Sequence, residues 1–581
     1  MERQVSLGSA TGEMHGPTGS GGGAGRRSGA WPVLVALVLV AVAVPLVVAW
    51  AYGALGTPRT DGWSYLATLF GFAETGRIDL NDWTSMTLIG QILLATPIAL
   101  VAERNVAAIQ IWTSFIGLGG LVAVVGLARR AGTTWWVGGL VAITVAVGPL
   151  WATLAASFMT DVPAFAAAMV TLLVGIEGLR RRPVSLPLIA AALALGLWAF
   201  SIRQYAVVPA VAVLAVAILL AVQSGDRQRL RRLVAMGGLL AVGVVGIQLW
   251  WVAIPNDKAL SPVVPGPGSI WDAVVEATKL MRVVGLLLVP VLLLAGPIRI
   301  LQRAWRASPG VVLVVATVVG SAQIVTHVRA SDVPFLGGYF ERTGIQAEVV
   351  LAGNRPDLVP APLFELLVAV GSAAAVLLAV AAIPPLVELV ARARARDLGV
   401  RDPVIAAIAV AVAGYSAAYF VAAAADLPLF DRYALPLLPL VALLVVRGAR
   451  SDGVERSPRA LAGAGVALGL LAMLGLAYTI DAAAFDGTRR RVAELAVAAG
   501  YPPETVNGGF EWVNEHLEAG QSPVLGHGFP AGARPCVVVV VNPDEVPAGR
   551  VVARRVSRLP WRPTETFVAL RTGCDCEVAS R

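Results

Sequence analysis

One polar cluster follows the first long apolar segment of the chain, in the stretch GTPRTDGWSYLATL that covers Gly56–Leu69. It contains a carboxylate, Asp61, beside Arg59 and two aromatic residues, Trp63 and Tyr65. A connecting loop needs only solubility, whereas a carboxylate at a lipid–water boundary can orient or deprotonate a hydroxyl nucleophile. The same carboxylate could instead cap the helix that begins after it. The position predicts Asp61 as a catalytic base or as a structural cap.

Two arginines, Arg203 and Arg432, lie in short links between apolar segments where basic residues are otherwise rare. A tyrosine follows closely in each case, Tyr205 and Tyr433. A guanidinium stays charged and its planar fork binds two oxygens of a phosphate, so both arginines are predicted to bind a phosphate group. They could also be interfacial anchors whose charged heads reach the membrane surface. Asp161, in the link MTDVP, is either a helix cap ahead of a first-turn proline or a substrate ligand.

Longer loops on the same side hold further polar candidates. Lys258, in the proline-rich stretch PNDKALSPVVPGPG, is predicted to join the phosphate ligands. The predicted substrate-binding residues are Arg59, Trp63, Tyr65, Asp161, Tyr205, Tyr433, Asp332 and Glu341. Glu74, Asp79 and Asp82 are expected to form a solvated face instead. The sequence predicts no cofactor with certainty, and it leaves open whether a divalent cation takes part.

The composition places these residues in a membrane protein. The chain has 581 residues, of which 57% are hydrophobic and only 14% charged, and its mean hydropathy is +0.75. Soluble domains carry about 25% charged residues. Repeated apolar runs of about 20 residues are each long enough to cross a hydrocarbon core of ~30 Å. The sequence therefore predicts an all-α, polytopic membrane protein.

About thirteen membrane spans are predicted by this criterion. They cover Val33–Leu55, Asn105–Leu127, Trp135–Ala155, Val162–Leu179, Val184–Phe200, Tyr205–Val222, Leu233–Ile254, Leu280–Ile300, Val311–Thr326, Pro362–Val390, Pro403–Ala424, Tyr433–Val446 and Leu461–Ile480. Basic clusters occupy every second connection, which is the positive-inside pattern. The N-terminus is therefore expected in the cytoplasm, and an odd number of spans puts the C-terminus outside. The net charge of +8 reports orientation in the membrane and not a nucleic-acid partner.

The span centres consist almost only of Ala, Val, Leu and Gly, with isolated amides such as Gln110, Gln248 and Gln323. An ion-coupled transporter would place titratable groups near the midplane. Polar residues collect at the outer ends instead, so the pattern favours an enzyme that works at the outer rim. Ser85–Val101 is apolar, but counting it as a span would reverse every later basic loop. We expect a helix on the outer leaflet there.

Three regions follow from this organisation. Residues 1–32 are rich in Gly and Ser and are expected to form a disordered, cytoplasmic N-terminus. Residues 33–480 form the transmembrane domain, and its first outer loop covers residues 56–104. Residues 481–581 are expected to form a small extracytoplasmic α/β domain, since about 100 residues suffice for one.

The expected C-terminal domain has its own sequence signals. Residues 488–500 are typical of a helix that ends at a glycine, and the runs CVVVVV from Cys536 and TFVALR from Thr566 are typical of strands. All three cysteines lie in this region, where a disulfide between Cys536 and either Cys574 or Cys576 could persist. Cys574 and Cys576 are not expected to bind zinc, because a zinc site needs a second pair of ligands and none is nearby in the sequence.

Several features together resemble the GT-C superfamily of integral-membrane glycosyltransferases, which includes the aminoarabinose transferases and protein O-mannosyltransferases. The resemblance rests on Asp61 just after the first span, on the long first outer loop, and on the motifs TDVPAF (Thr160–Phe165) and FDRYALPLLP (Phe430–Pro439). The number of spans and the exported tail also match, and the similarity covers roughly Val33–Ile480. One departure is Gly62, where many relatives have a second acidic residue.

This resemblance implies a function. Members of the superfamily use lipid-phosphate sugar donors and have a catalytic acid in the first outer loop, a role that the resemblance carries to Asp61. It implies a plasma-membrane transferase that moves a hexose or pentose from a polyprenyl-phosphate donor in a single inverting displacement. The acceptor on the outer face would be a cell-envelope glycan, lipid or protein. The alternative is a transporter or flippase of a lipid-linked sugar.

Overall fold

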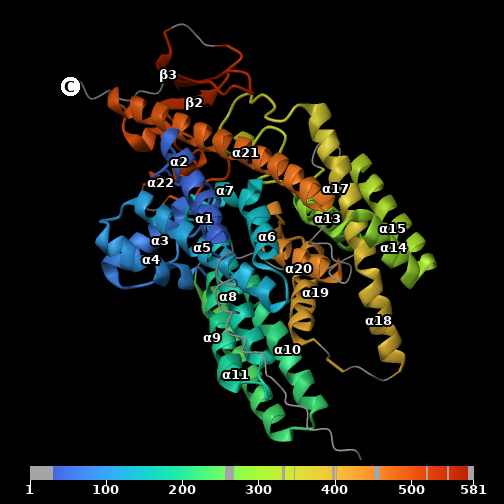
Figure 1. Cartoon of the computed structure of the whole chain (residues 1–581). Coiled ribbons are helices and arrows are strands. Elements are labelled where there is room, and N and C mark those ends of the chain that lie inside the picture. Colours follow the sequence, from blue (N-terminus) through green and yellow to red (C-terminus); the bar gives the residue numbers. More distant parts are fainter. Residues whose placement is uncertain are drawn as a thin grey trace, which may run out of the picture.

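The structure combines a large helical bundle with a small sheet at one end of it (Figure 1). The computed structural model describes residues 30–254, 267–329, 334–345, 347–395, 399–400, 402–449, 458–518, 521–545 and 549–572. Helices dominate these residues as far as residue 498, and the strands of the sheet follow. The chain is therefore a helical, multi-pass membrane protein with a small C-terminal α/β part.

The helices in the first half are α1 (Ala30–Val38), α2 (Val44–Ala51), α3 (Gly62–Thr75), α4 (Ile89–Val101), α5 (Val106–Arg130), α6 (Trp135–Val147), α7 (Pro149–Ala155), α8 (Asp161–Arg180), α9 (Leu186–Ile202), α10 (Val208–Gln223) and α11 (Arg227–Ala253). Those in the second half are α12 (Pro267–Leu287), α13 (Val289–Ala295), α14 (Pro297–Ala307), α15 (Pro309–Arg329), α16 (Ala347–Val350), α17 (Ala361–Ala381), α18 (Ile383–Arg394), α19 (Pro403–Ala424), α20 (Leu437–Ala449), α21 (Pro458–Ala498) and α22 (Phe510–Glu515). A π-helical turn, η1 (Leu39–Ala43), links α1 to α2, and 3-10 turns cover η2 (Gln204–Val207), η3 (Asp431–Ala434) and η6 (Pro503–Thr505).

Ten helices within the described ranges are long and apolar enough to cross a membrane, or up to twelve spans if each of two bent helix pairs counts as one. The apolar helices α9, of 17 residues, and α4, of 13 residues, are shorter. Each predicted span falls on one of the ten helices, on a bent pair or on α9. The helix predicted at Ser85–Val101 is α4, which packs on α3, α5 and α9.

Two predicted spans are wrong as single helices, because each contains a break marked by proline. Trp135–Ala155 divides into α6 and α7, which meet at 71° around Gly148 and Pro149. Leu280–Ile300 is the end of α12, followed at 65° by α13 and then by α14, and prolines also stand at the starts of these helices. Proline has no N–H to donate and disfavours helical geometry in the residue before it, so each helix ends there.

A buried arginine lies in α12, near the start of the predicted span Leu280–Ile300. Arg282 is fully buried, and its Nε donates to Gln323 Oε1 at 2.9 Å. Its two terminal nitrogens donate to the carbonyl oxygens of Gln323 and Pro334, at 2.8 and 2.5 Å. These bonds satisfy the charged group inside the protein, so Arg282 ties α12 to α15.

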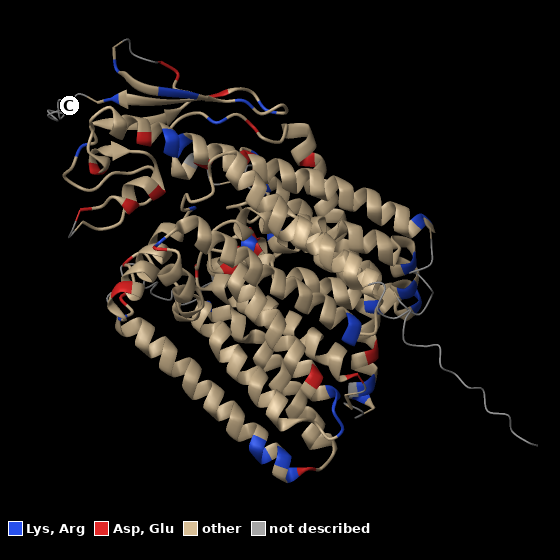
Figure 2. Ribbon diagram, turned by 60° about the vertical axis from the view of Figure 1, so that its left-hand side comes forward, with Lys and Arg blue, Asp and Glu red and all other residues tan. Residues whose placement is uncertain are grey.

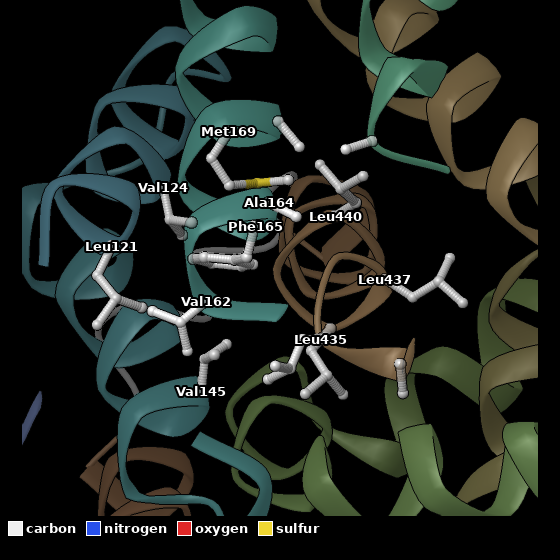
Figure 3. Close-up of a cluster of buried hydrophobic side chains, with 14 of the residues drawn as sticks. Leu121, Val124, Val145, Val162, Ala164, Phe165, Met169, Leu435, Leu437 and Leu440 are labelled. Atoms are coloured by element: carbon white, nitrogen blue, oxygen red, sulfur yellow. The ribbon is translucent and has the colours of Figure 1, made fainter. Parts of the chain in front are cut away.

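The core of the bundle forms where α5, α6, α8 and α20 meet (Figure 3). Leu121 of α5 lies there beside Val162 and Phe165 of α8. A Cβ added at Gly120 would lie only 2.6 Å from the Cα of Ala166, so the backbones of α5 and α8 are in close contact. Small residues at such contacts let membrane helices pack by van der Waals forces, which replace the hydrophobic effect in lipid.

The long helix α21 joins the bundle to the sheet. It runs without a break for 41 residues, so the helix predicted at residues 488–500 is the end of a longer one. It packs on α7 and α13 in the bundle and on β3 and β4 of the sheet. A Cβ at Gly475 would lie 1.9 Å from the Val147 carbonyl oxygen, and one at Gly487 would lie 1.9 Å from that of Tyr52. The backbone of α21 therefore contacts both the end of α6 and the end of α2.

The sheet has the order β1-β2-β4-β3, with β1 (Val506–Asn507), β2 (Val537–Val541), β3 (Val551–Ser557) and β4 (Glu565–Arg571). The strands predicted from Cys536 and Thr566 are confirmed as β2 and β4, which pair antiparallel. The sequence of β3 does not alternate between apolar and polar residues in the way that predicts a strand. β3 is an edge strand in which only Ser557 is buried. Cys536 is disulfide-bonded, and its partner lies outside the described residues.

Basic residues gather at the helix ends that lie away from the sheet (Figure 2). Basic residues occupy the last turns of α5, α8 and α14 and the first turn of α11. This distribution agrees with the positive-inside pattern of the sequence. The orientation of the two termini remains a prediction.

The contact of α21 with the α6–α7 break gives a first prediction. Gly475→Ala would force a methyl group into the Val147 carbonyl, and overpacking of this kind costs about 1–3 kcal/mol. Gly469→Ala, on the same helix, is the control, because nothing lies within 4 Å of its added Cβ. We expect a lower melting temperature in detergent for Gly475→Ala and an unchanged or higher one for Gly469→Ala. Equal melting temperatures for the two variants would contradict the close contact.

Candidate functional site

Asp61 stands at the start of α3 with its carboxylate unused by the helix. It occupies the N-cap position, but its side chain makes no capping hydrogen bond, so the structural-cap interpretation is wrong. Oδ1 accepts a hydrogen bond from Trp83 Nε1 at 2.8 Å, and Oδ2 lies 3.8 Å from Arg432 Nη2. The side chain keeps 24% of its surface exposed. One carboxylate oxygen is thus held in place while the other can meet a ligand.

Arg432 is presented to Asp61 by the 3-10 turn η3. The neighbouring Asp431 is fully buried and accepts hydrogen bonds from the backbone N–H groups of Tyr339 and Phe340, at 2.9 and 2.5 Å. These bonds fix η3 against the loop at residues 334–345. Arg432 itself is only 3% exposed, and its guanidinium carbon lies 4.5 Å from the Phe430 ring centre. The turn and the rings around it hold a buried cation beside the proposed base.

Part of the Arg432 guanidinium has no hydrogen-bond partner among the described residues. Its Nε and Nη1 atoms are buried and make no hydrogen bond within the described residues. Nε lies 3.7 Å from Asp161 Oδ1, which is an ion pair without hydrogen-bond geometry. A buried polar group that lacks a partner costs free energy unless a ligand supplies one. The guanidinium therefore suits an anion with several acceptor oxygens, such as a phosphate.

Asp161 connects the second arginine to the first. Arg203 Nη1 lies 2.7 Å from Asp161 Oδ1, and both side chains are at most 4% exposed. The same nitrogen donates to Thr160 Oγ1 at 2.8 Å. Asp161 is the first residue of α8, and neither of its carboxylate oxygens accepts a hydrogen bond, so it does not cap the helix. The interpretations of Asp161 as a cap and of Arg203 and Arg432 as membrane anchors are therefore wrong, because these side chains form one buried ionic cluster.

Tyrosine rings surround Arg203. Its guanidinium carbon lies 4.5 Å from the ring centre of Tyr433 and 5.3 Å from that of Tyr205. Tyr205 in turn packs against Tyr415 and Tyr419, with ring centres 6.1 Å away in each case. The faces of aromatic rings attract cations, most strongly where water is excluded. Tyr205 and Tyr433, which are predicted to bind substrate, thus lie beside Arg203.

Two further tyrosine hydroxyls near the cluster remain protonated. Burial raises the pKa of Tyr65 well above its usual value, and the negative charge of Asp61 raises it further. Burial also raises the pKa of Tyr339, whose hydroxyl lies 3.4 Å from Thr60 Oγ1. Both groups therefore stay neutral at physiological pH and can donate hydrogen bonds.

The aromatic residues after Asp61, which the sequence predicts to bind substrate, are packed against other parts of the protein. Trp63 is 4% exposed and packs against Phe510 of α22, with ring centres 6.4 Å apart. Tyr65 is 1% exposed and belongs to the core of the bundle. The buried face of α3 is thus covered by protein and not by lipid. Glu74, Asp79 and Asp82 are exposed, as predicted.

A second ionic chain links the Asp61 loop to the C-terminal region, and no sequence pattern predicts it. Arg59 Nε lies 2.7 Å from Asp486 Oδ2, so Arg59 faces α21. Asp486 also pairs with Arg489 at 3.3 Å, and Arg489 pairs with Glu511 of α22 at 2.7 Å. Glu511 returns to the loop, because its Oε1 accepts the N–H of Thr60 at 2.7 Å. All of these side chains are at least nine-tenths buried.

A third buried ionic cluster joins the loop before α17 to the sheet. Asp481 of α21 lies 2.9 Å from Arg355 and also pairs with Arg562. Arg355 reaches Glu565 of β4 at 2.8 Å. A Cβ at Gly344 would lie 2.3 Å from Asp481 Oδ2, so only glycine fits against this cluster. These pairs hold the sheet against α21 and lie apart from Asp61.

The remaining predicted site residues fall in different places. Glu341 accepts the N–H of Gly338 at 2.7 Å and so closes the turn that carries Tyr339. Lys258 and Asp332 lie outside the described residues. Within the described part of the chain, no group of three or more His, Cys, Asp or Glu side chains is arranged to hold a metal ion.

No protein-family model matches the sequence, and no curated protein matches it. Among solved structures, the chain is similar to ArnT from Cupriavidus metallidurans in the apo state, with 15% identity and a TM-score of 0.39. It is also similar to the same protein bound to undecaprenyl phosphate, with 13% identity and a TM-score of 0.43. Each match covers 93% of this chain and 98% of ArnT.

The Arg203–Asp161 pair gives a prediction about stability. Arg203→Ala would leave Asp161 buried with only the distant Arg432 as counter-charge, and breaking a buried pair in this way costs about 3–5 kcal/mol. Arg104→Ala removes an exposed pair with Glu74 and serves as the control, with an expected cost below about 1 kcal/mol. Thermal unfolding in detergent should rank the two variants accordingly. A similar small loss for both would mean that Asp161 does not depend on Arg203.

Proposed function

We propose that this protein is a glycosyltransferase of the plasma membrane, which moves a sugar from a polyprenyl-phosphate donor to an acceptor on the extracytoplasmic face. One observation carries the proposal: a partly exposed carboxylate, Asp61, lies beside a buried guanidinium, Arg432, that has unpartnered N–H groups. This arrangement supports a base and a phosphate-binding group that act next to one another. The ArnT neighbour bound to undecaprenyl phosphate supports a lipid-phosphate ligand.

In the proposed reaction, Arg432 and Arg203 bind the donor phosphate and Asp61 acts on the acceptor. The acceptor hydroxyl gives its proton to Asp61 Oδ2 while its oxygen forms a bond to the anomeric carbon of the sugar. The bond from that carbon to the phosphate oxygen breaks, and polyprenyl phosphate leaves with the electron pair, stabilised by the guanidinium groups. A single displacement of this kind inverts the anomeric centre.

The loose contact between Asp61 and Arg432 fits a change on donor binding. At 3.8 Å, the pair is weaker than the 2.7 Å pair between Arg203 and Asp161. A phosphate on Arg432 would replace Asp61 as its counter-charge, and Asp61 would then be free to accept a proton. The sugar ring could enter between the two groups only after they separate, since nucleophile and leaving group approach the anomeric carbon from opposite faces. Trp83 keeps Asp61 Oδ1 in place meanwhile.

Asp61→Asn tests the base. Asparagine keeps the shape and can accept the Trp83 N–H bond, but it cannot take the acceptor proton, so we expect transfer to fall about 10²–10⁴-fold. Release of polyprenyl phosphate from labelled lipid-linked sugars, with the purified full chain, measures this rate. Glu74→Gln, an exposed carboxylate on α3, should remain active. Wild-type transfer by Asp61→Asn would overturn the mechanism.

Arg432→Gln tests the phosphate ligand. It removes the charge and the fork that bind two oxygens, so affinity for undecaprenyl phosphate should fall about 10–100-fold, which corresponds to the 1.5–3 kcal/mol of a charge-assisted hydrogen bond. Arg342→Gln, whose exposed side chain pairs with Asp357, is the control. Unchanged binding by Arg432→Gln would refute this assignment.

Movement of a labelled lipid-linked sugar across vesicles, without any glycosidic product, would favour the transporter instead.

A further inference from the structure

Thr60, directly before Asp61, has a backbone conformation that needs outside support. Its φ is +46°, in the left-handed region that a β-branched residue rarely adopts. Such a conformation costs about 1–3 kcal/mol and persists only where the surrounding structure fixes it. Since Asp61 follows Thr60 in the chain, the torsion at Thr60 decides where the Asp61 carboxylate points.

The support comes from the C-terminal region. The backbone N–H of Thr60 donates to Glu511 Oε1 at 2.7 Å, across 451 residues of sequence. Glu511 is 2% exposed and lies on the short helix α22. A hydrogen bond to a buried carboxylate is stronger than one between neutral groups, because the acceptor is charged and water does not compete.

Glu511 is itself held by further buried charges. Arg489 of α21 lies 2.7 Å from Glu511 and 3.3 Å from Asp486, and Asp486 pairs with Arg59. Arg59 also donates to the carbonyl oxygen of Thr153 at the end of α7, at 2.8 Å. The two residues before Asp61 are therefore fixed from both sides, by the C-terminal region and by the bundle.

We propose that Glu511 is a positioning residue, which sets the direction of Asp61 by holding Thr60 in its left-handed conformation. This inference rests on the proposed function, in which Asp61 is the base. The C-terminal region is then part of the catalytic machinery and not a separate attachment. Misplacement of a base by about 1 Å can lower the reaction rate on the order of 10²-fold. Loss of the single hydrogen bond between Thr60 and Glu511 would therefore be enough to slow the reaction.

Three variants of the full-length protein separate this role from a general structural one. Glu511→Ala removes both the acceptor of the Thr60 N–H and the partner of Arg489, whereas Glu511→Gln keeps an acceptor oxygen and removes only the charge. Glu515→Gln, on the same helix and partly exposed, is the matched control. We expect kcat to fall about 10²-fold for Glu511→Ala and less than about 5-fold for Glu511→Gln, with the donor KM unchanged in both. The control should behave as wild type.

Hydrogen exchange of the Thr60 amide provides a readout that needs no substrate. Loss of a charged acceptor worth about 1.5–3 kcal/mol should make this amide exchange about 10–100-fold faster in Glu511→Ala, while the amides of α5 and α8 stay protected. Unchanged exchange in Glu511→Ala would overturn the inference whatever the activity. A fall in kcat as large for Glu511→Gln as for Glu511→Ala, or a matching rise in KM, would also overturn it. A wild-type protein that protects Thr60 but transfers no sugar would refute the proposed function instead.

Discussion

The arrangement of the site depends on Asp161, which is a single buried carboxylate between two arginines. Removing any ion from water costs several kcal/mol, and here the cost is offset only if the charges remain together. Arg203 lies 2.7 Å and Arg432 3.7 Å from the same oxygen. The three side chains come from the start of α8, the end of α9 and the turn before α20, so this cluster fixes three parts of the bundle around one point.

The sequence indicated which residues form this cluster, but it did not indicate which side chains surround them. Asp61, Asp161, Arg203 and Arg432 stood out because polar residues are rare beside apolar segments, and the structure brings all four together. Their burial was not predictable, because a lone arginine at the end of a span looks the same whether it faces lipid headgroups or a carboxylate distant in sequence. Sequence periodicity predicts the faces of one helix but not which side chain meets it from another.

The ionic chain through Glu511 was missed for a related reason. Apart from Arg59, its members lie on α21 and α22, in a region whose charged residues resemble those of any solvated surface. Its burial and its contacts with Thr60 and Arg489, which only the structure shows, distinguish Glu511 from the exposed Glu515 on the same helix. The breaks in α6–α7 and α12–α13 were likewise marked by glycine or proline, yet their bends of 71° and 65° depend on the packing of neighbouring helices. Glycine and proline in the sequence therefore mark where a helix breaks, whereas tertiary contacts determine the angle of the bend.

The unbroken length of α21 has a consequence for how the protein can be divided. At about 1.5 Å per residue, a helix of 41 residues is about 60 Å long, which exceeds the thickness of a bilayer core. Asp481, where a sequence-based boundary would fall, lies inside this helix and binds the loop and strand residues around it. A chain that ended at residue 480 would lack the carboxylates that pair with Arg59 and Arg355. We therefore expect the two regions to fold as one unit.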